Sequence, residues 1–476
     1  MKYAKIICLA VGLLLLTYTG IRAYKLSFTH DESYSYLYAS QDSFMEIISN
    51  RTKEISPNNH ILNTLFMKLF DNTTGSSEFS LRMQSLVAHV IYLLFGFLIL
   101  RKFNSPVLLV TGFLILNLNP YLLDFFSLAR GYALSIAFMM MSLYYFLVYL
   151  QEVKDKQLAF SLIAACFAIL SNFALINFLA AILIIHQVWL FTRFRSIKLS
   201  FLKSKIVFIT LLVMGIILYE PLRKLIKYKR FDFGGYDGIW KNTVGSEIEA
   251  FFYKQSYQDS FFIATNIFIL ASVSGLILIA SVKLYRRKVI ESDLTAIVSA
   301  AALFLILLIN ILQHKIMGTP YIMERFALFI TPLYLLVPVY LFNAASTGNK
   351  ALKYTGIAAS IFIAAAMSIH FTKCMNTTYA CTWKYDASTK EMLKDLDDEY
   401  KSAGKKKVRL GITWLYEPGI NFYRSTRKLS WLEKVTREGI KKEYDFYYIS
   451  DDDKESLPSN KIVIRRYPAA GSKLLK

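Results

Sequence analysis

The chain has 476 residues, of which 55% are hydrophobic, 15% are aromatic and only 19% are charged. A soluble protein carries about a quarter charged residues, so this composition argues against a soluble multidomain protein. The net charge of +21 comes from Lys and Arg residues divided among short loops. Because these residues are not gathered on one face, they argue against nucleic-acid binding. Their division among loops is typical of membrane proteins, in which basic residues mark the cytoplasmic loops.

Apolar blocks of about twenty residues, long enough to cross a bilayer core as a helix, recur along the chain. The first, Ile6 to Gly20, follows a short basic start. A cleaved signal peptide is the alternative, but the following Arg22 to Lys25 offers no small-residue cleavage site. We therefore expect an uncleaved first helix, a cytoplasmic N-terminus and a first outer loop over residues 24–81.

Two adjacent acids lie in this outer loop, in Thr29-His30-Asp31-Glu32-Ser33-Tyr34. Thr29 and Glu32 have the spacing of a capping box, which would start a helix and favour Asp31 near its N-terminus. Farther along, residues 44–51 have the spacing of an amphipathic helix on the membrane surface. After Pro57, residues 60–67 place His60 and Met67 on one face of a second short helix.

Ten further apolar segments are expected to span the membrane. They lie at about 82–100, 106–120, 131–149, 158–173, 175–192, 206–222, 259–283, 292–312, 325–343 and 354–371. Basic residues occupy every second loop, at 101–102, 154–156, 193–205, 283–288 and 350–353, as the positive-inside rule requires of cytoplasmic loops. The sequence therefore predicts a mainly α bundle of about eleven spans over residues 1–371. The long aromatic loop 223–258 would face outward and act as a lid.

The pattern changes beyond residue 372. A charged helical pattern covers 385–403, and strand patterns cover 407–412, 446–450 and 461–464, so residues 372–476 should form a small extracytoplasmic α/β domain. Cys374 and Cys381 could pair if that side is oxidising. Cys8 and Cys166 lie in apolar runs, and the four cysteines form no metal-binding pattern.

Charged residues collect at the outer ends of the expected spans, where membrane insertion is expensive unless they have a function. They are Asp31, Glu32, Arg82, Asp124, Arg130, Arg223, Lys224, Glu324 and Arg325. Each also has a structural explanation. Glu32 can cap a helix, Arg82 can pair with Glu78 one turn earlier, and the others can flank span ends. Their convergence on one side favours a site that handles a lipid phosphate and a polar acceptor.

Five segments resemble motifs of one enzyme group. They occur in the same order along the chain as in that group and on the same expected side of the membrane. They are His30-Asp31-Glu32-Ser33-Tyr34, Pro57 to Leu62, Ser80 to Ser85, Leu128 to Leu134, and Glu324-Arg325-Phe326 with Pro332. Over residues 5–371 the chain resembles the GT-C glycosyltransferases, and most closely the protein O-mannosyltransferase and lipid A aminoarabinose transferase group. It departs from the family pattern where two Asn replace prolines before Ile61 and where Met83-Gln84 replaces Leu-Pro.

The resemblance implies a hexosyl- or pentosyltransferase that moves one sugar from a polyprenyl-phosphate carrier to an extracytoplasmic acceptor, with inversion. Asp31 would be the base and Glu32 its catalytic partner. The donor phosphate would be bound by Arg130 and Arg325, with Arg82 and Lys224 as second choices. Donor or acceptor would be positioned by His60, Tyr34 and Glu324. No cofactor is expected; a divalent cation held by the carboxylates stays open as an alternative, although it lacks a convincing third ligand.

Two other function classes stay open. A lipid-linked sugar flippase or secondary transporter would show paired halves and polar groups near the midplane, which this sequence does not display. A polysaccharide polymerase or ligase would use outer arginines but needs no Asp-Glu pair. The expected partners are the carrier-linked sugar, membrane lipids and a protein, lipid or glycan acceptor, with no nucleic acid. The expected location is the bacterial inner membrane.

Overall fold

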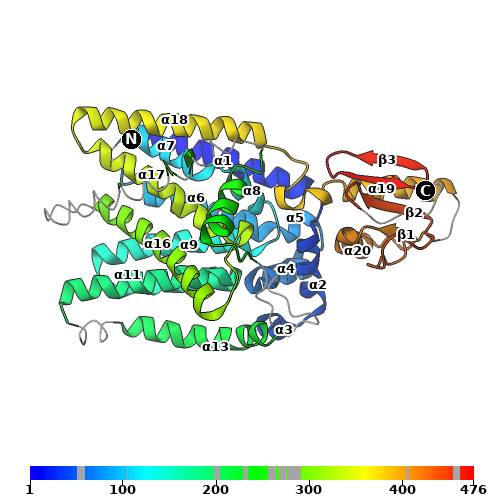
Figure 1. Ribbon diagram of the computed structural model, residues 1–476, viewed down its shortest axis with the longest axis horizontal. Helices are drawn as coiled ribbons and strands as arrows, with labels where there is room; N and C mark the ends of the chain where they lie inside the picture. The colour runs from blue at the N-terminus through cyan, green and yellow to red at the C-terminus, as the bar shows by residue number, and fades with distance from the viewer. Residues whose placement is uncertain are drawn as a thin grey trace.

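The computed structural model describes residues 1–50, 59–103, 105–196, 204–228, 234–255, 291–403, 407–453 and 461–476, with a few isolated residues between these ranges. Long helices lie side by side in a bundle, and a small sheet lies beyond one end of it (Figure 1). The C-terminus is at the sheet, whereas the N-terminus is toward the opposite end of the bundle. We call the end beside the sheet the sheet end.

Eight helices in the described ranges are long and apolar enough to cross a membrane. They are Lys2–Lys25 (α1), Met83–Leu100 (α6), Gly131–Glu152 (α9), Phe173–Phe194 (η1 and α11), Lys205–Lys227 (α13), Leu294–Met317 (within α16, Glu291–Met317), Leu328–Ser346 (η4 and α17) and Lys350–Cys374 (α18). The helices α7 (Pro106–Asn117) and α10 (Asp155–Ser171) are shorter. The expected span 259–283 lies outside the described residues, so the count of eleven stays a prediction. The membrane helices and the small C-terminal sheet are confirmed.

Local signals start and reverse these helices. The Ser105 side chain accepts the Leu108 N–H ahead of Pro106 at the first position of α7, and Asn349 caps α18 in the same way. The tight reversal expected near Asn172 is a short 3₁₀ turn, Phe173–Leu175 (η1), where the Asn172 side chain accepts the Ala174 N–H. Because successive helices reverse direction, the loops that carry the candidate acids and arginines gather at the sheet end (Figure 1).

Short helices lie among the long ones, several of them toward the sheet end (Figure 1). They are His30–Gln41 (α2), Phe44–Ile48 (α3), Ile61–Thr74 (α4), Glu78–Leu81 (α5), Pro120–Phe125 (α8) and Ser246–Phe251 (α14), which follows the π-helix Trp240–Gly245 (η2). The second predicted helix of the first outer loop is α4, and it buries Asn63, Thr64 and Met67 as its periodicity indicated. The first is α3, although Arg51 of its expected face is outside the described residues. The lid function of loop 223–258 stays a prediction, because residues 229–233 also lie outside them.

The region beyond α18, residues 375–476, is called the C-terminal region below. Its elements are Cys381–Asp386 (η5), Thr389–Ala403 (α19), Leu410–Ile412 (β1), Trp414–Tyr416 (η6), Glu417–Thr426 (α20), Phe446–Ser450 (β2), Val463–Tyr467 (β3) and Ser472–Leu475 (β4). The sheet has the order β1-β2-β4-β3, with β1 parallel to β2 and the other pairs antiparallel. The three predicted strands are present as β1, β2 and β3, whereas no clear sequence pattern predicted α20 and β4.

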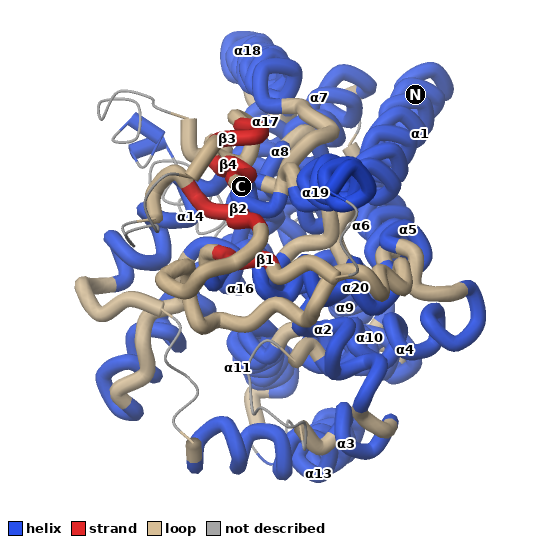
Figure 2. The backbone as a smooth tube through the Cα atoms, turned by 90° about the vertical axis from the view of Figure 1, so that its right-hand side faces the viewer, coloured by secondary structure: helices blue, strands red, loops and turns tan. Residues whose placement is uncertain are grey.

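The C-terminal region shares a hydrophobic core with the sheet end of the bundle. Phe28 stacks on Phe422 of α20 with ring centroids 4.0 Å apart, and Tyr36 of α2 meets the same ring edge-on at 5.1 Å. The same buried cluster includes Met67 and Leu81 of the bundle. Seen from the sheet end, the strands and α19 lie in front of the ends of the long helices (Figure 2). This packing brings residues separated by more than 350 positions to the start of α2.

Candidate active site

The start of α2 is fixed by a capping box. The Glu32 N–H donates to Thr29 Oγ1 at 3.4 Å, and Glu32 Oε2 accepts the Thr29 N–H at 2.9 Å. The sequence prediction of this motif is confirmed. The side chains of Asp31 and Glu32 are both buried, and they take different partners. The two adjacent acids therefore have separate roles.

Glu32 forms a bidentate ion pair with Arg82. Arg82 Nε donates to Oε1 and Nη2 donates to Oε2, both at 2.7 Å, and neither side chain is exposed to solvent. Other N–H groups of Arg82 donate to the carbonyls of Ala23, Leu26 and Ser27. Glu32 Oε1 also accepts the Ala129 N–H at 2.6 Å. This pair joins the end of α1, the start of α2 and the segment before α9.

The alternative pairing of Arg82 with Glu78 is not the ion pair that forms. Glu78 instead lies 3.1 Å from the Lys390 ammonium and 3.3 Å from the Arg427 guanidinium. Arg82 has the bidentate geometry that suits a phosphate, but its donors already face protein acceptors. The expected role of Arg82 as a phosphate ligand stays a prediction.

Asp31 faces two arginines. Its Oδ2 lies 3.6 Å from Arg130 Nη2 and 3.7 Å from Arg325 Nη2. These distances are too long for hydrogen bonds, and Oδ2 has no hydrogen-bond partner among the described residues. Arg130 is held separately, because its Nη1 donates to the Asp31 carbonyl at 3.0 Å and to Ser35 Oγ at 2.6 Å. The structure thus brings Asp31, Arg130 and Arg325 together.

Arg325 comes from a distorted segment, Glu324–Phe326 (η3). Glu324 has a φ of 45°, a left-handed conformation that non-glycine residues rarely adopt. Its N–H donates to Ser246 Oγ at 2.9 Å, and its carboxylate lies 3.1 Å from the Lys254 ammonium. The Arg325 guanidinium lies over the rings of Phe326 and Trp383, with an 18% exposed side chain. It is the arginine of the cluster that a ligand reaches most easily.

His60 lies near Arg130 and Arg325, and its ring packs edge-on against Tyr132 with the ring centroids 4.8 Å apart. Burial and the nearby Arg130 charge hold its pKa well below the usual histidine range, so the imidazole is neutral. Its Nε2 has no partner among the described residues. A Cβ on Gly131 would lie 2.6 Å from the His60 Cβ and 2.0 Å from the Ser171 carbonyl oxygen, so this close approach requires glycine.

Tyr34 and Lys224 lie toward other partners. Arg437 of the C-terminal region donates to the Tyr34 hydroxyl and lies over its ring at 5.4 Å. The Lys224 ammonium is 3.7 Å from Glu220 and donates to the backbone carbonyls of Ser49 and Asn50 at 3.4 Å. Lys224 therefore belongs to the contact between α13 and the loop after α3.

Asp386 and Glu247 are among the buried acids that the sequence analysis missed. Asp386, at the end of η5, accepts the His30 N–H on Oδ2 at 2.7 Å. Its pKa is raised well above the usual range by burial and by the charges of Asp31 and Glu32. Its position in an aromatic segment just after the last span was the available signal. The second acid, Glu247, accepts a hydrogen bond from the Thr331 hydroxyl.

Glu247 should make the stability of the protein depend on pH. Burial, with a contribution from the Glu324 charge, raises its pKa to about 8, so the folded protein binds a proton that an unfolded chain releases near pH 4.5. The stabilisation is complete at low pH and is lost as the pH rises toward 8. We expect the unfolding temperature of the wild type to fall between pH 6 and 9 more steeply than that of Glu247→Gln, which mimics the protonated acid. Parallel curves would contradict this assignment.

A second buried ion pair anchors the segment after α18. Arg22 of α1 pairs with Asp124 of α8, and it also donates to the Asn376 carbonyl at 2.6 Å. Asp124 accepts from the Tyr253 hydroxyl at 3.0 Å and from the Cys381 N–H at 2.7 Å. This network is structural, since its groups hold one another. All four cysteines are free, so the structure shows no Cys374–Cys381 bridge.

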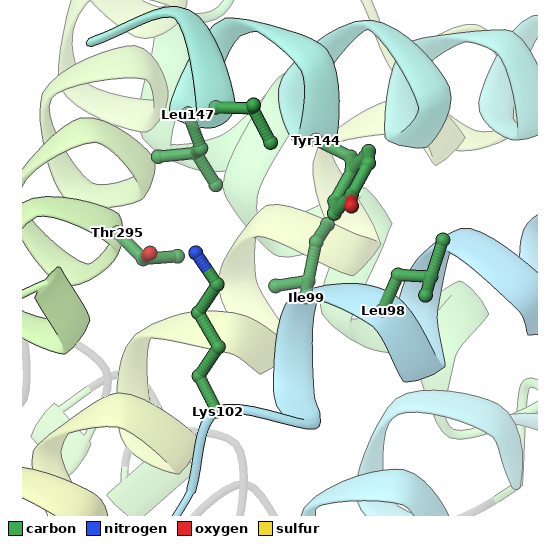
Figure 3. A pocket seen from close by; sticks show the side chains of 7 residues that line it. Leu98, Ile99, Lys102, Tyr144, Leu147 and Thr295 are labelled. Atoms are coloured by element: carbon green, nitrogen blue, oxygen red, sulfur yellow. The ribbon is translucent and has the colours of Figure 1, made fainter. Parts of the chain in front are cut away.

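Two pockets in the described part of the chain are small, at about 10 Å³ each, which suits roughly one water molecule. One is lined by Thr29, Trp383 and Asp386 beside the acid cluster. The other lies between α6, α9 and α16, where the Lys102 amine points toward Thr295 and Leu147 (Figure 3). It contains none of the candidate residues. Within the described ranges no three His, Cys, Asp or Glu side chains are grouped to hold a metal ion.

Residues 57–221 match the model of the family described as dolichyl-phosphate-mannose-protein mannosyltransferase. No curated protein matches the sequence significantly. The structure is similar to two crystal structures of ArnT from Cupriavidus metallidurans, one bound to undecaprenyl phosphate and one in the apo state. Each is 11% identical to this protein in sequence, and each alignment covers 99% of this chain and 97% of the ArnT chain. The TM-scores are 0.54 and 0.53. The chain therefore has the fold of these ArnT structures, and the GT-C fold expected from the sequence is confirmed.

Proposed function

We propose that this protein transfers a single sugar from a polyprenyl-phosphate carrier to an acceptor hydroxyl at the sheet end of the bundle, with inversion. One observation carries the proposal. Asp31 presents an oxygen without a hydrogen-bond partner among the described residues, and this oxygen lies between two buried or nearly buried arginines. A base next to phosphate-binding groups is the pairing that this reaction needs.

In the proposed reaction the acceptor oxygen attacks the anomeric carbon as Asp31 takes its proton. The bond from that carbon to the phosphate oxygen breaks, and the polyprenyl phosphate leaves with the electron pair. A single displacement of this kind inverts the anomeric centre. Arg325 stabilises the charge that develops on the phosphate, because a guanidinium binds phosphate oxygens through two parallel hydrogen bonds.

The other candidate site residues have supporting roles that follow from their contacts. Arg130 fixes Asp31 through its backbone carbonyl while it adds positive charge beside the phosphate site. Glu32 and Arg82 hold the start of α2. Neutral His60 can orient a hydroxyl or phosphate oxygen by hydrogen bonding. Glu324 shapes the turn that carries Arg325, and Tyr34 lies at the contact with Arg437.

The similarity to ArnT bound to undecaprenyl phosphate supports a polyprenyl phosphate as the carrier. The match to a dolichyl-phosphate-mannose-dependent family supports the same class of donor. We further propose a bacterial inner-membrane location, from the likeness of the C-terminal region to the extracytoplasmic domain of some bacterial family members. The alternation of basic loops supports a cytoplasmic N-terminus and an extracytoplasmic C-terminal region. The acceptor is a protein, a lipid or a glycan.

The direct test uses purified protein in lipid vesicles with a labelled polyprenyl-phosphate sugar and protein, lipid or glycan fractions as acceptors. We expect release of polyprenyl phosphate that depends on the acceptor, with the label transferred to it. Movement of the intact lipid between leaflets without cleavage would identify a flippase instead. Extension of a lipid-linked glycan by whole repeat units would identify a polymerase.

Arg325→Ala should weaken binding of polyprenyl phosphate roughly 10- to 100-fold, since hydrogen bonds to charged groups contribute about 1.5–3 kcal/mol. Arg325→Lys should recover only part of this affinity, because an ammonium cannot bind in a bidentate manner. Binding would be followed by titration of the protein in detergent with the carrier lipid. The matched control is Arg223→Ala, which removes a half-exposed arginine paired with Glu220. Equal affinities for the two alanine variants would exclude the phosphate role of Arg325.

A further inference from the structure

The start of α2 is held by residues from the C-terminal region. The Phe28 N–H donates to the Tyr423 hydroxyl at 2.7 Å, and the Ser27 hydroxyl donates to the Ala387 carbonyl at 3.0 Å. These contacts join positions more than 350 residues apart, at the point where the proposed base is located.

His30 is bound through both its backbone and its ring. Its N–H donates to Asp386 Oδ2 at 2.7 Å, and its Nδ1 lies 2.7 Å from the Leu415 carbonyl oxygen. The N–H of His30 is one of the first-turn amides that a helix cannot satisfy internally. The capping box satisfies the Glu32 N–H, and Asp386 satisfies that of His30. The helix start is thus completed by a group from another part of the chain.

Asp386 is buried against α20 and beside two other acids. Only 1% of the residue is exposed, and a Cβ on Gly419 of α20 would lie 3.8 Å from its Oδ1. Burial and the charges of Asp31 and Glu32 raise its pKa well above the usual range, which favours the neutral acid. A neutral carboxyl can accept the His30 N–H without adding a third negative charge to the site.

We propose that Asp386 is a positioning residue: through the His30 amide it holds the first turn of α2, and with it Asp31, in place between Arg130 and Arg325. This inference rests on the proposed function. Asp31 directly follows the anchored residue, and a displacement of about 1 Å in a reacting group can reduce a rate about 100-fold. The C-terminal region then contributes to the rate of transfer and is more than an appendage of the membrane bundle.

The test compares two substitutions of Asp386 with a matched control. Asp386→Ala removes the acceptor of the His30 N–H and should lower kcat at least about tenfold, with polyprenyl-phosphate affinity unchanged. Asp386→Asn keeps an oxygen in the same place, stays neutral and should retain most of kcat. The control Asp445→Ala removes another carboxylate–backbone bond of the C-terminal region, from the Arg409 N–H, and should leave kcat unchanged.

A second measurement does not depend on activity. Hydrogen exchange of residues 28–34 should be faster in Asp386→Ala than in the wild type, Asp386→Asn and Asp445→Ala. An Asp386→Asn protein that is folded but inactive would overturn the proposal, because it would make the carboxylate itself a reacting group. Unchanged exchange and unchanged kcat in Asp386→Ala would also overturn it, and Asp31 could still be the base. If the wild-type protein showed no transfer activity, the proposed function would be refuted. Faster exchange in Asp386→Ala would still support the anchoring of the first turn of α2.

Discussion

Asp31→Asn should lower the rate of sugar transfer by at least about 100-fold, the usual contribution of a general base, while carrier-lipid affinity should change by less than about twofold. Asparagine has the same shape as aspartate and cannot take the acceptor proton. Since Oδ2 of Asp31 lies beyond hydrogen-bonding distance from both arginines, the amide should leave the positions of Arg130 and Arg325 unchanged. The substitution therefore removes the chemistry with little change in structure.

The rate would be measured as release of labelled sugar in single-turnover experiments, and affinity by titration with polyprenyl phosphate. Asp71→Asn is a suitable control, because Asp71 is another partly buried acid at the sheet end, where it accepts from Ser76 at 2.5 Å. It should keep full activity. A fully active Asp31→Asn protein would exclude Asp31 as the base, and Glu32 could not easily replace it because both of its oxygens accept from Arg82.

Local patterns were predictable from sequence, and long-range pairing was not. The capping box at Thr29 and the buried face of α4 are set by residues within one or two turns, so their spacing was sufficient. The local spacing offered Glu78 as the partner of Arg82, whereas the pairing with Glu32, 50 positions away, depends on tertiary packing.

The missed residues follow the same rule. Asp386 meets His30 from 356 positions away, and nothing in the local sequence specifies that contact. The raised pKa of Glu247 results mainly from its burial in the folded protein, which the periodicity of the sequence cannot reveal. The convergence of Asp31, Arg130 and Arg325 was predictable in outline, because alternating basic loops place all three at the same ends of their helices. Which arginine stays accessible required the structure.

Arg82→Met should destabilise the protein by about 3–5 kcal/mol, the typical effect of removing one partner of a buried ion pair. Both side chains of the pair are excluded from solvent, and Arg82 also satisfies three backbone carbonyls. Without it, the Glu32 carboxylate stays buried with only the N–H groups of Thr29 and Ala129 as identified donors. The combined variant Glu32→Gln with Arg82→Met should recover part of the loss, because it leaves no uncompensated charge.

Unfolding of the purified variants with heat gives the comparison, with Arg427→Met as the control. Arg427 also pairs with an acid, Glu78, but its side chain is 43% exposed, so its loss should have little effect on stability. A small effect of Arg82→Met would contradict the structural role. If Arg82 acts through folding alone, the folded fraction of Arg82→Met should bind polyprenyl phosphate with the affinity of the wild type. Weaker binding of polyprenyl phosphate by fully folded Arg82→Met would instead indicate that Arg82 binds the phosphate together with Arg325.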